Sequence, residues 1–104
     1  ENGLGAIDEK TTDNQIHDDY RINYLHDHIL QMKKAVFRRW CSVIGLYPWG
    51  CIDLVAASTG QMSKRYGFIY VDVDDYGQGT GNRYRKDSFY WYRDMIATNG
   101  AEIN

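Results

Sequence analysis

The sequence has little cysteine and no long apolar run, and both shortages exclude classes of protein. Its only two cysteines, Cys41 and Cys51, form no Cys-x-x-Cys motif and have no histidine at metal-ligand spacing. We therefore expect free thiols rather than a disulfide framework or a zinc site. No segment approaches the roughly 20 apolar residues of a membrane span, and no apolar signal segment is present. These absences favour a soluble, cytoplasmic protein that does not contact a membrane.

The sequence also lacks an excess of either charge. Twelve basic and fourteen acidic residues give a formal net charge of -2, and they are mixed along the chain. Such a chain has no strong positive field to attract nucleic acid or an anionic membrane surface. We expect neither as a partner.

What is present is a clear order of predicted elements. Residues 1–16 are rich in Gly, Asp, Thr and Asn, which is typical of a strand end that leads into a long loop. An amphipathic helix is predicted from Asp18 onward, with Asp18 and Asp19 placed to cap its start. Its apolar residues recur at steps of three and four, at Ile22, Leu25, Ile29, Met32 and Val36;.

Three further elements complete the series. Residues 43–49 (VIGLYPW) predict a short buried strand with Pro48 at its end. Residues 66–72 and 83–85 flank a turn rich in Gly and Asp and predict a hairpin. A last helix is expected to begin near Asp87 or Ser88 and to stop at Asn99-Gly100. Its inward-facing residues would be Phe89, Tyr92 and Ile96.

This order predicts an α/β fold with an incomplete sheet. Two strand-to-helix units in succession imply parallel strands, and two parallel strands do not form a stable sheet alone. A chain that begins at Glu1 without Met, where a strand ends, is expected to be the tail of a larger α/β protein. Because such a unit leaves apolar surface uncovered, we also expect it to self-associate, at least as a dimer.

Several long motifs resemble the family 1 glycoside hydrolases, and especially their bacterial 6-phospho-β-glucosidase members. Glu1-Asn2-Gly3 is similar to the motif that carries the nucleophile of this family at a strand end. The other matching stretches are His17-Asp18-Asp19-Tyr20-Arg21-Ile22, Trp49-Gly50-Cys51-Ile52-Asp53-Leu54, Ser58-Thr59-Gly60, Ser63 to Asp72 (SKRYGFIYVD) and Ser88-Phe89-Tyr90-Trp91-Tyr92. They are contiguous, occur in the family's order and cover nearly the whole chain.

The resemblance implies a fold and an activity. Residues 1–104 would be the C-terminal fragment of a single (β/α)8 TIM barrel domain, about its last two strand–helix units plus a β-hairpin. Glu1 would be the nucleophile of a retaining hydrolase that cleaves 6-phospho-β-D-glucosides to glucose 6-phosphate and an aglycone, without metal or organic cofactor. The family's acid, in an Asn-Glu-Pro motif far upstream, has no counterpart here, so the fragment alone is expected to be inactive.

The loop of residues 58–67 (STGQMSKRYG) is the predicted substrate-binding segment. Hydroxyl, ammonium and phenol groups at Ser58, Lys64 and Tyr66 suit a phosphate, although a polar loop of this kind can equally be an ordinary solvated turn. The resemblance implies that these three residues bind the sugar's 6-phosphate. It also implies that Trp49 stacks on the sugar ring, whereas its residue type alone is at least as compatible with a core position.

Other patterns have plainer interpretations. Asp72, Asp74 and Asp75 weakly suggest a calcium loop, but Arg83 stands where a bidentate Glu is needed, so we predict a hairpin turn. The glycines at 77, 79 and 81 have the wrong spacing for a dinucleotide-binding motif and are interpreted as turn glycines. His26 and His28 point to different sides of their helix, which argues against a shared metal.

One patch departs from the family pattern. Where the family usually has a Glu-Asp-Gly-Val turn, this chain has Phe37 to Val43 (FRRWCSV). Codons for Arg-Arg-Trp-Cys read one base later spell Glu-Asp-Gly-Val, so a local frameshift is one hypothesis. If the residues are real, we expect an exposed Trp40 or an altered contact.

Two other functions also stay open, a non-catalytic fragment that binds phosphate or phospho-sugars and a truncated product without a function.

Overall fold

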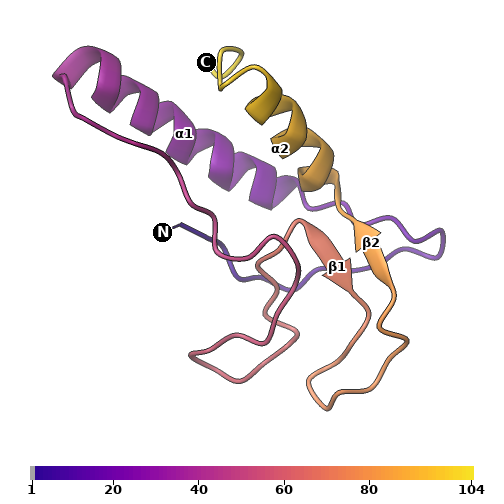
Figure 1. Ribbon diagram of the computed structural model, residues 1–104. Coiled ribbons are helices and arrows are strands. Elements are labelled where there is room, and N and C mark those ends of the chain that lie inside the picture. Colours follow the sequence, from indigo (N-terminus) through magenta and orange to yellow (C-terminus); the bar gives the residue numbers. More distant parts are fainter. Residues whose placement is uncertain (1) are drawn as a thin grey trace.

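The structure, a computed structural model, describes residues 2–104 and contains two helices packed above a small hairpin (Figure 1). The elements are α1 (Asp19–Arg39), β1 (Ile69–Val71), β2 (Arg83–Arg85) and α2 (Asp87–Ala97). The Cα radius of gyration is 15.0 Å, larger than the about 13 Å of a compact 100-residue domain. The described part of the chain is therefore an open α/β unit and contains no closed barrel.

Helix α1 forms where the apolar spacing predicts it. Leu25 and Ile29 are buried, and the flanking positions of the stripe are half-buried. Asp18 is the residue before the helix, but its side chain makes no capping hydrogen bond. The prediction of a carboxylate cap was wrong because Arg21 and Ser88 bind this carboxylate instead.

The predicted hairpin is confirmed, with a shorter first strand. Strands β1 and β2 are antiparallel, with Tyr70 opposite Tyr84. The turn glycines at 77, 79 and 81 have positive φ angles, as turns require;. The aspartates of this turn accept hydrogen bonds from loop groups, for example Asp74 from the amides of Tyr76 and Gln78.

The predicted buried strand over residues 43–49 does not form. Val43 is 42% and Ile44 91% exposed, and within residues 2–104 the segment contributes a single parallel bridge, between Asn2 and Pro48. A strand buried on both faces needs partners on both sides, and the described residues provide a single contact on one side. The expected parallel sheet is thus reduced to isolated bridges, the second joining Ile52 and Ile69.

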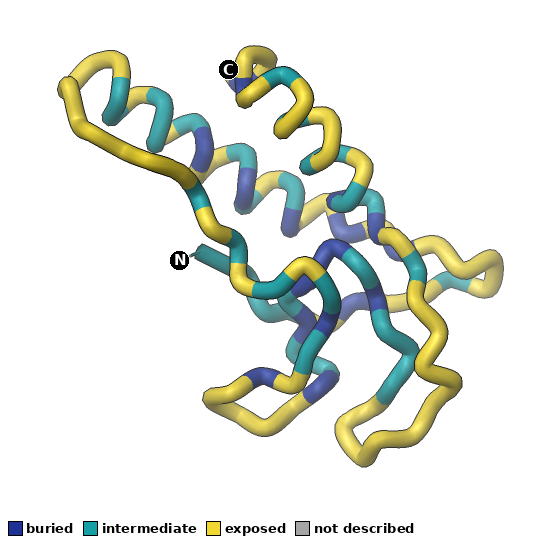
Figure 2. The backbone as a smooth tube through the Cα atoms, viewed as in Figure 1, coloured by how far each residue is buried: buried dark blue, intermediate teal, exposed yellow. Residues whose placement is uncertain are grey.

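Helix α2 packs across α1 and forms the core with it (Figure 2). The buried core residues are Leu25, Ile29, Phe68 and Ile103. Tyr92 stacks on Phe68 with ring centroids 4.6 Å apart. The prediction that Ile96 points inward was wrong, because it is 59% exposed and Met95 packs on the core in its place.

The end of α1 carries the patch that departs from the family pattern. Trp40 caps the helix in the left-handed region, with φ 56°, and its side chain is 91% exposed. The predicted exposure is confirmed. Cys41 and Cys51 are both free and exposed, as expected. No helix within residues 2–104 is long and apolar enough to cross a membrane.

Candidate functional site

A cavity of about 500 Å³ lies between the first residues of the chain, α1 and the loop that precedes β1. Its lining residues are Asn2, Gly3, Tyr24, Trp49, Ala57, Ser58 and Tyr66. Three of the five predicted site residues, Trp49, Ser58 and Tyr66, therefore meet at one cavity. Lys64 is half-buried in the same loop and does not line it. Glu1, the predicted nucleophile, lies outside the described residues.

Asn2 holds one side of the cavity in place. Its amide donates to the Tyr47 carbonyl at 2.9 Å, and its carbonyl accepts from the Trp49 amide at 2.6 Å. These two bonds form the parallel bridge that brings Trp49 beside the start of the chain. Trp49 is 38% exposed, so part of its ring stays accessible at the cavity. An accessible indole face can stack on the apolar face of a sugar.

Tyr24 is a cavity residue that the sequence reasoning did not single out. Its hydroxyl donates to Asn2 Oδ1 at 2.6 Å, and its ring packs against His28 at 4.1 Å between centroids. Tyr24 directly precedes Leu25, which belongs to the apolar stripe, and it lies one helical turn before His28. The hydrogen bond to Asn2 distinguishes Tyr24 from a tyrosine that only packs. Because the two residues are far apart in the sequence, no local pattern predicts this bond.

Tyr66 lies against two glycines near the start of the chain. A Cβ on Gly3 would lie 3.4 Å from Tyr66 Cδ1, and a Cβ on Gly5 would lie 2.4 Å from Tyr66 Cζ. The absence of side chains at both positions creates the space that the phenol ring fills. Gly3 and Gly5 are thus packed against Tyr66 of the loop of residues 58–67, although the two segments lie far apart in the sequence.

The turn that carries Ser58 is closed by backbone hydrogen bonds. The Gly60 amide donates to the Ala56 carbonyl at 2.7 Å, and the Ala56 amide donates to the Gln61 carbonyl at 2.9 Å. Gly60 has φ +68°, a conformation that favours glycine;. On the other side of the loop, the Ser63 amide and hydroxyl both donate to Asp75, which lowers the pKa of the Asp75 carboxyl.

Six buried charged side chains form a cluster that includes Arg65 of this loop. They are Asp8, Asp18, Arg21, Asp53, Arg65 and Lys86. Three acids and three bases balance, and each side chain is at most 7% exposed. Charges that leave water need partners of this kind, because an unpaired buried charge is strongly unfavourable. None of these residues lines the cavity.

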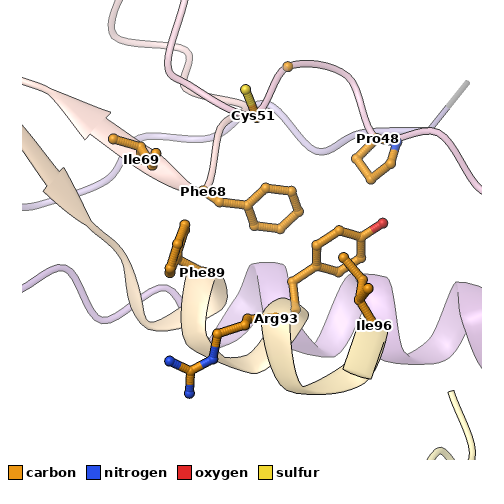
Figure 3. A pocket seen from close by; sticks show the side chains of 9 residues that line it. Pro48, Cys51, Phe68, Ile69, Phe89, Arg93 and Ile96 are labelled. Carbon is orange, nitrogen blue, oxygen red and sulfur yellow. The ribbon is translucent and has the colours of Figure 1, made fainter. Parts of the chain in front are cut away.

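A second cavity, of about 410 Å³, is apolar and has different lining residues from the first (Figure 3). Phe68 and Ile69 line it from the β1 region, and Phe89 and Ile96 line it from α2. Pro48 lines it from the segment of residues 43–49. Of the predicted site residues that the structure describes, none lines this second cavity. Among residues 2–104 no group of three or more His, Cys, Asp or Glu side chains could hold a metal ion.

The comparisons with known proteins identify the family. The sequence profile of glycosyl hydrolase family 1 matches residues 1–101. The chain belongs to glycosyl hydrolase family 1. Within it, the chain is 53% identical to a 6-phospho-beta-glucosidase of Clostridium longisporum and 55% identical to 6-phospho-beta-glucosidase AscB of Escherichia coli K12. It is also 55% identical to aryl-phospho-beta-D-glucosidase BglH of Bacillus subtilis.

The alignments cover nearly all of this chain but only a small part of each family 1 relative. Each of these alignments covers 99% of this chain and 22% of the relative. The family 1 β-glucosidase of Thermotoga maritima is a similar solved structure, with a TM-score of 0.83 and 38% identity, over 97% of this chain and 21% of that one. The chain therefore spans about a fifth of the family 1 proteins that it matches, in sequence and in structure.

Proposed function

We propose that this chain is the C-terminal part of a 6-phospho-β-glucosidase and carries that enzyme's sugar and phosphate contacts. The main support for this proposal is that Trp49, Ser58 and Tyr66 meet at one cavity beside Asn2-Gly3. In addition, the chain is 52% to 55% identical to proteins named for phosphorylated β-glucosides. The finer fold assignment, the last two strand–helix units of a (β/α)8 barrel plus a hairpin, belongs to the same proposal.

The proposed reaction is a retaining hydrolysis. The Glu1 carboxylate would attack the anomeric carbon, the bond from that carbon to the leaving oxygen would break, and an acid elsewhere in the whole enzyme would protonate the leaving oxygen. Water would then release glucose 6-phosphate from the covalent intermediate. Because Asn2 is fixed to Tyr47 and Trp49 through its backbone, a carboxylate adjoining it would act next to the sugar-stacking Trp49.

The phosphate contacts would come from the loop of residues 58–67. Ser58 and Tyr66 present hydroxyl donors at the cavity, and Lys64 supplies a positive charge from the same loop. Hydrogen bonds from such groups to a phosphate are charge-assisted and about twice as strong as neutral ones. Lys64 does not line the cavity, so its contact with the phosphate stays a prediction. The cytoplasmic location of the protein also stays a prediction.

The activity of the chain itself is tested with a chromogenic 6-phospho-β-glucoside. We expect no turnover by the chain alone, because it contains no counterpart of the family's proton donor. We expect turnover when the remaining part of a related 6-phospho-β-glucosidase is added as a separate polypeptide. Turnover by the chain alone would contradict this account of the missing acid.

A non-catalytic role, binding phospho-sugars through Ser58, Lys64 and Tyr66, is the second candidate. The same cavity favours it, since binding needs no proton donor. Titration with glucose 6-phosphate, followed in ¹H-¹⁵N spectra, tests the site in both cases. We expect Lys64→Ala to weaken binding about tenfold or more. An unchanged affinity would remove Lys64 from the site.

A further inference from the structure

Arg65 lies between Lys64 and Tyr66, and its buried side chain does not line the cavity. It is 6% exposed. Nη1 donates to Asp53 Oδ2 at 3.1 Å and to the Val71 carbonyl at 2.8 Å, and Nη2 donates to the Val73 carbonyl at 3.1 Å. The guanidinium also lies 4.0 Å from the centroid of the Tyr70 ring. These contacts use the planar, forked geometry that distinguishes arginine from lysine.

Asp53 holds the chain on both sides of Tyr66. One carboxylate oxygen accepts from the Arg65 side chain, and the other accepts from the Gly67 amide at 3.0 Å. The same oxygen accepts from Lys86 Nζ at 2.7 Å. The residues before and after Tyr66 are therefore attached to a single buried carboxylate.

The backbone of Arg65 is fixed as well. Its amide donates to the Ala6 carbonyl at 2.8 Å, and its carbonyl accepts from the Ala6 amide at 2.9 Å. The same carbonyl accepts from Arg21 Nη2 at 3.0 Å. Both polar backbone groups of Arg65 thus have fixed partners, one of them a buried guanidinium.

The surrounding charges keep Asp53 in place. Lys86 is completely buried and also donates to Asp8 at 2.6 Å, and Asp8 in turn accepts from Arg21. Removing one partner from a buried ion pair is strongly unfavourable because it leaves an uncompensated charge. The carboxylate of Asp53 consequently has little freedom to turn, and the peptide on either side of Tyr66 has little freedom to follow.

We propose that Arg65 and Asp53 are positioning residues, which fix Tyr66 in the orientation that binds a sugar phosphate. The inference rests on the proposed function. It assigns the buried charges a purpose beyond stability, because a binding group that is held in its bound orientation loses less conformational entropy when the ligand arrives.

The main test is the variant Arg65→Lys, which keeps the charge and shortens the reach of the donors. Dissociation constants for glucose 6-phosphate and for glucose are measured by NMR titration of the 104-residue chain. We expect binding of glucose 6-phosphate to weaken about tenfold and binding of glucose to stay the same, so the preference for the phosphorylated sugar falls about tenfold.

Ser88→Ala is the matched control. Ser88 is completely buried in the same charged cluster, and its amide and hydroxyl both donate to Asp18 and not to residues 58–67. We expect this variant to unfold at a lower denaturant concentration and to keep the full preference for the phosphorylated sugar. An equal loss of preference in Ser88→Ala would show that general destabilisation is the cause and would overturn the inference.

Other outcomes separate the inference from the proposed function. If the unmodified chain prefers glucose 6-phosphate and folded Arg65→Lys keeps that preference, the positioning role is overturned and the proposed function stands. If the unmodified chain binds glucose 6-phosphate no more tightly than glucose, both fail.

A measurement on the unmodified chain covers the case in which Arg65→Lys does not fold. The Gly67 amide, which donates to Asp53, should exchange with solvent slowly in the free chain, because this hydrogen bond is formed before the ligand binds. Fast exchange of this amide in the free chain would overturn the inference.

Discussion

The phenol ring of Tyr66 occupies the space that a side chain at position 5 would fill. A Cβ on Gly5 would lie 2.4 Å from Tyr66 Cζ and 2.7 Å from its hydroxyl oxygen. Gly5 belongs to the segment that follows Asn2-Gly3, and Tyr66 belongs to the predicted phosphate-binding loop. The contact between them joins the two halves of the candidate site.

The variant Gly5→Ala should displace the Tyr66 ring without unfolding the chain. The ring is half-buried and is the movable end of a side chain, so it can shift away from the new methyl group. We expect binding of glucose 6-phosphate to weaken about tenfold, measured by NMR titration. Gly45→Ala is the control, because a Cβ there would meet Tyr47 at an ordinary 3.5 Å. Equal affinities in both variants would show that the Tyr66 ring position is unimportant.

The variant Trp40→Gly should stabilise the chain. Trp40 has φ 56° at the end of α1 and is 91% exposed, so it bears a left-handed conformation while burying little apolar surface. Such a conformation costs a residue with a Cβ about 1 kcal/mol, and glycine adopts it without that cost. We expect the free energy of unfolding in urea to rise by about this amount.

Trp40→Ala separates conformation from side-chain loss, because alanine keeps the Cβ and therefore the left-handed penalty. It should leave stability nearly unchanged. A gain as large as that of glycine would point to the indole, and not to the backbone, as the source of strain. The result also bears on the frameshift hypothesis, in which a Gly codon underlies this position.

The stability of the chain should fall as the pH rises through the titration of His17. His17 Nδ1 lies 2.7 Å from Asp87 Oδ2, and this hydrogen bond and the negative charge of Asp87 raise the pKa of His17 above its usual 6.5. A folded-state pKa above the unfolded value favours folding fully below pH 6.5 and loses this contribution as the pH passes the raised pKa.

The measurement is the free energy of unfolding from about pH 5.5 to about pH 8.5, for the unmodified chain and for His17→Gln. The difference between the two should be largest at the acidic end and shrink toward the alkaline end. His26 and His28 are present in both proteins, so their effects cancel in the difference. A difference that is independent of pH would contradict the role of the pair.

The apolar cavity should support self-association of the isolated chain. Phe68, Phe89 and Ile96 line it, and Ile96 is 59% exposed. Uncovered apolar surface of this kind favours association. Sedimentation velocity over a range of concentrations should show a dimer that Ile96→Asp weakens. Ile7→Asp is the control, since Ile7 is 75% exposed and lies outside this cavity. A monomer at every concentration would contradict the prediction.

Local patterns predicted the helices and the hairpin well. The stripe through Leu25 and Ile29 predicts α1, and Asn99-Gly100 marks the end of α2, where both residues have positive φ angles. The prediction failed at residues 43–49, because an apolar, β-prone run reports what a segment would bury and not whether a neighbouring strand exists to bury it. The prediction that Ile96 points inward failed because Met95 packs on the core in its place.

By itself, the sequence determined the family and the residue types of the candidate site, because the long contiguous motifs can be read directly from the order of residues. Only the tertiary structure decided which of those residues meet. It placed Trp49, Ser58 and Tyr66 at one cavity, left Lys64 off its wall, and revealed Asp53 bonded on both sides of Tyr66. The physical reason is that a hydrogen bond or a ring against a glycine depends on distances across the fold, which no local spacing records.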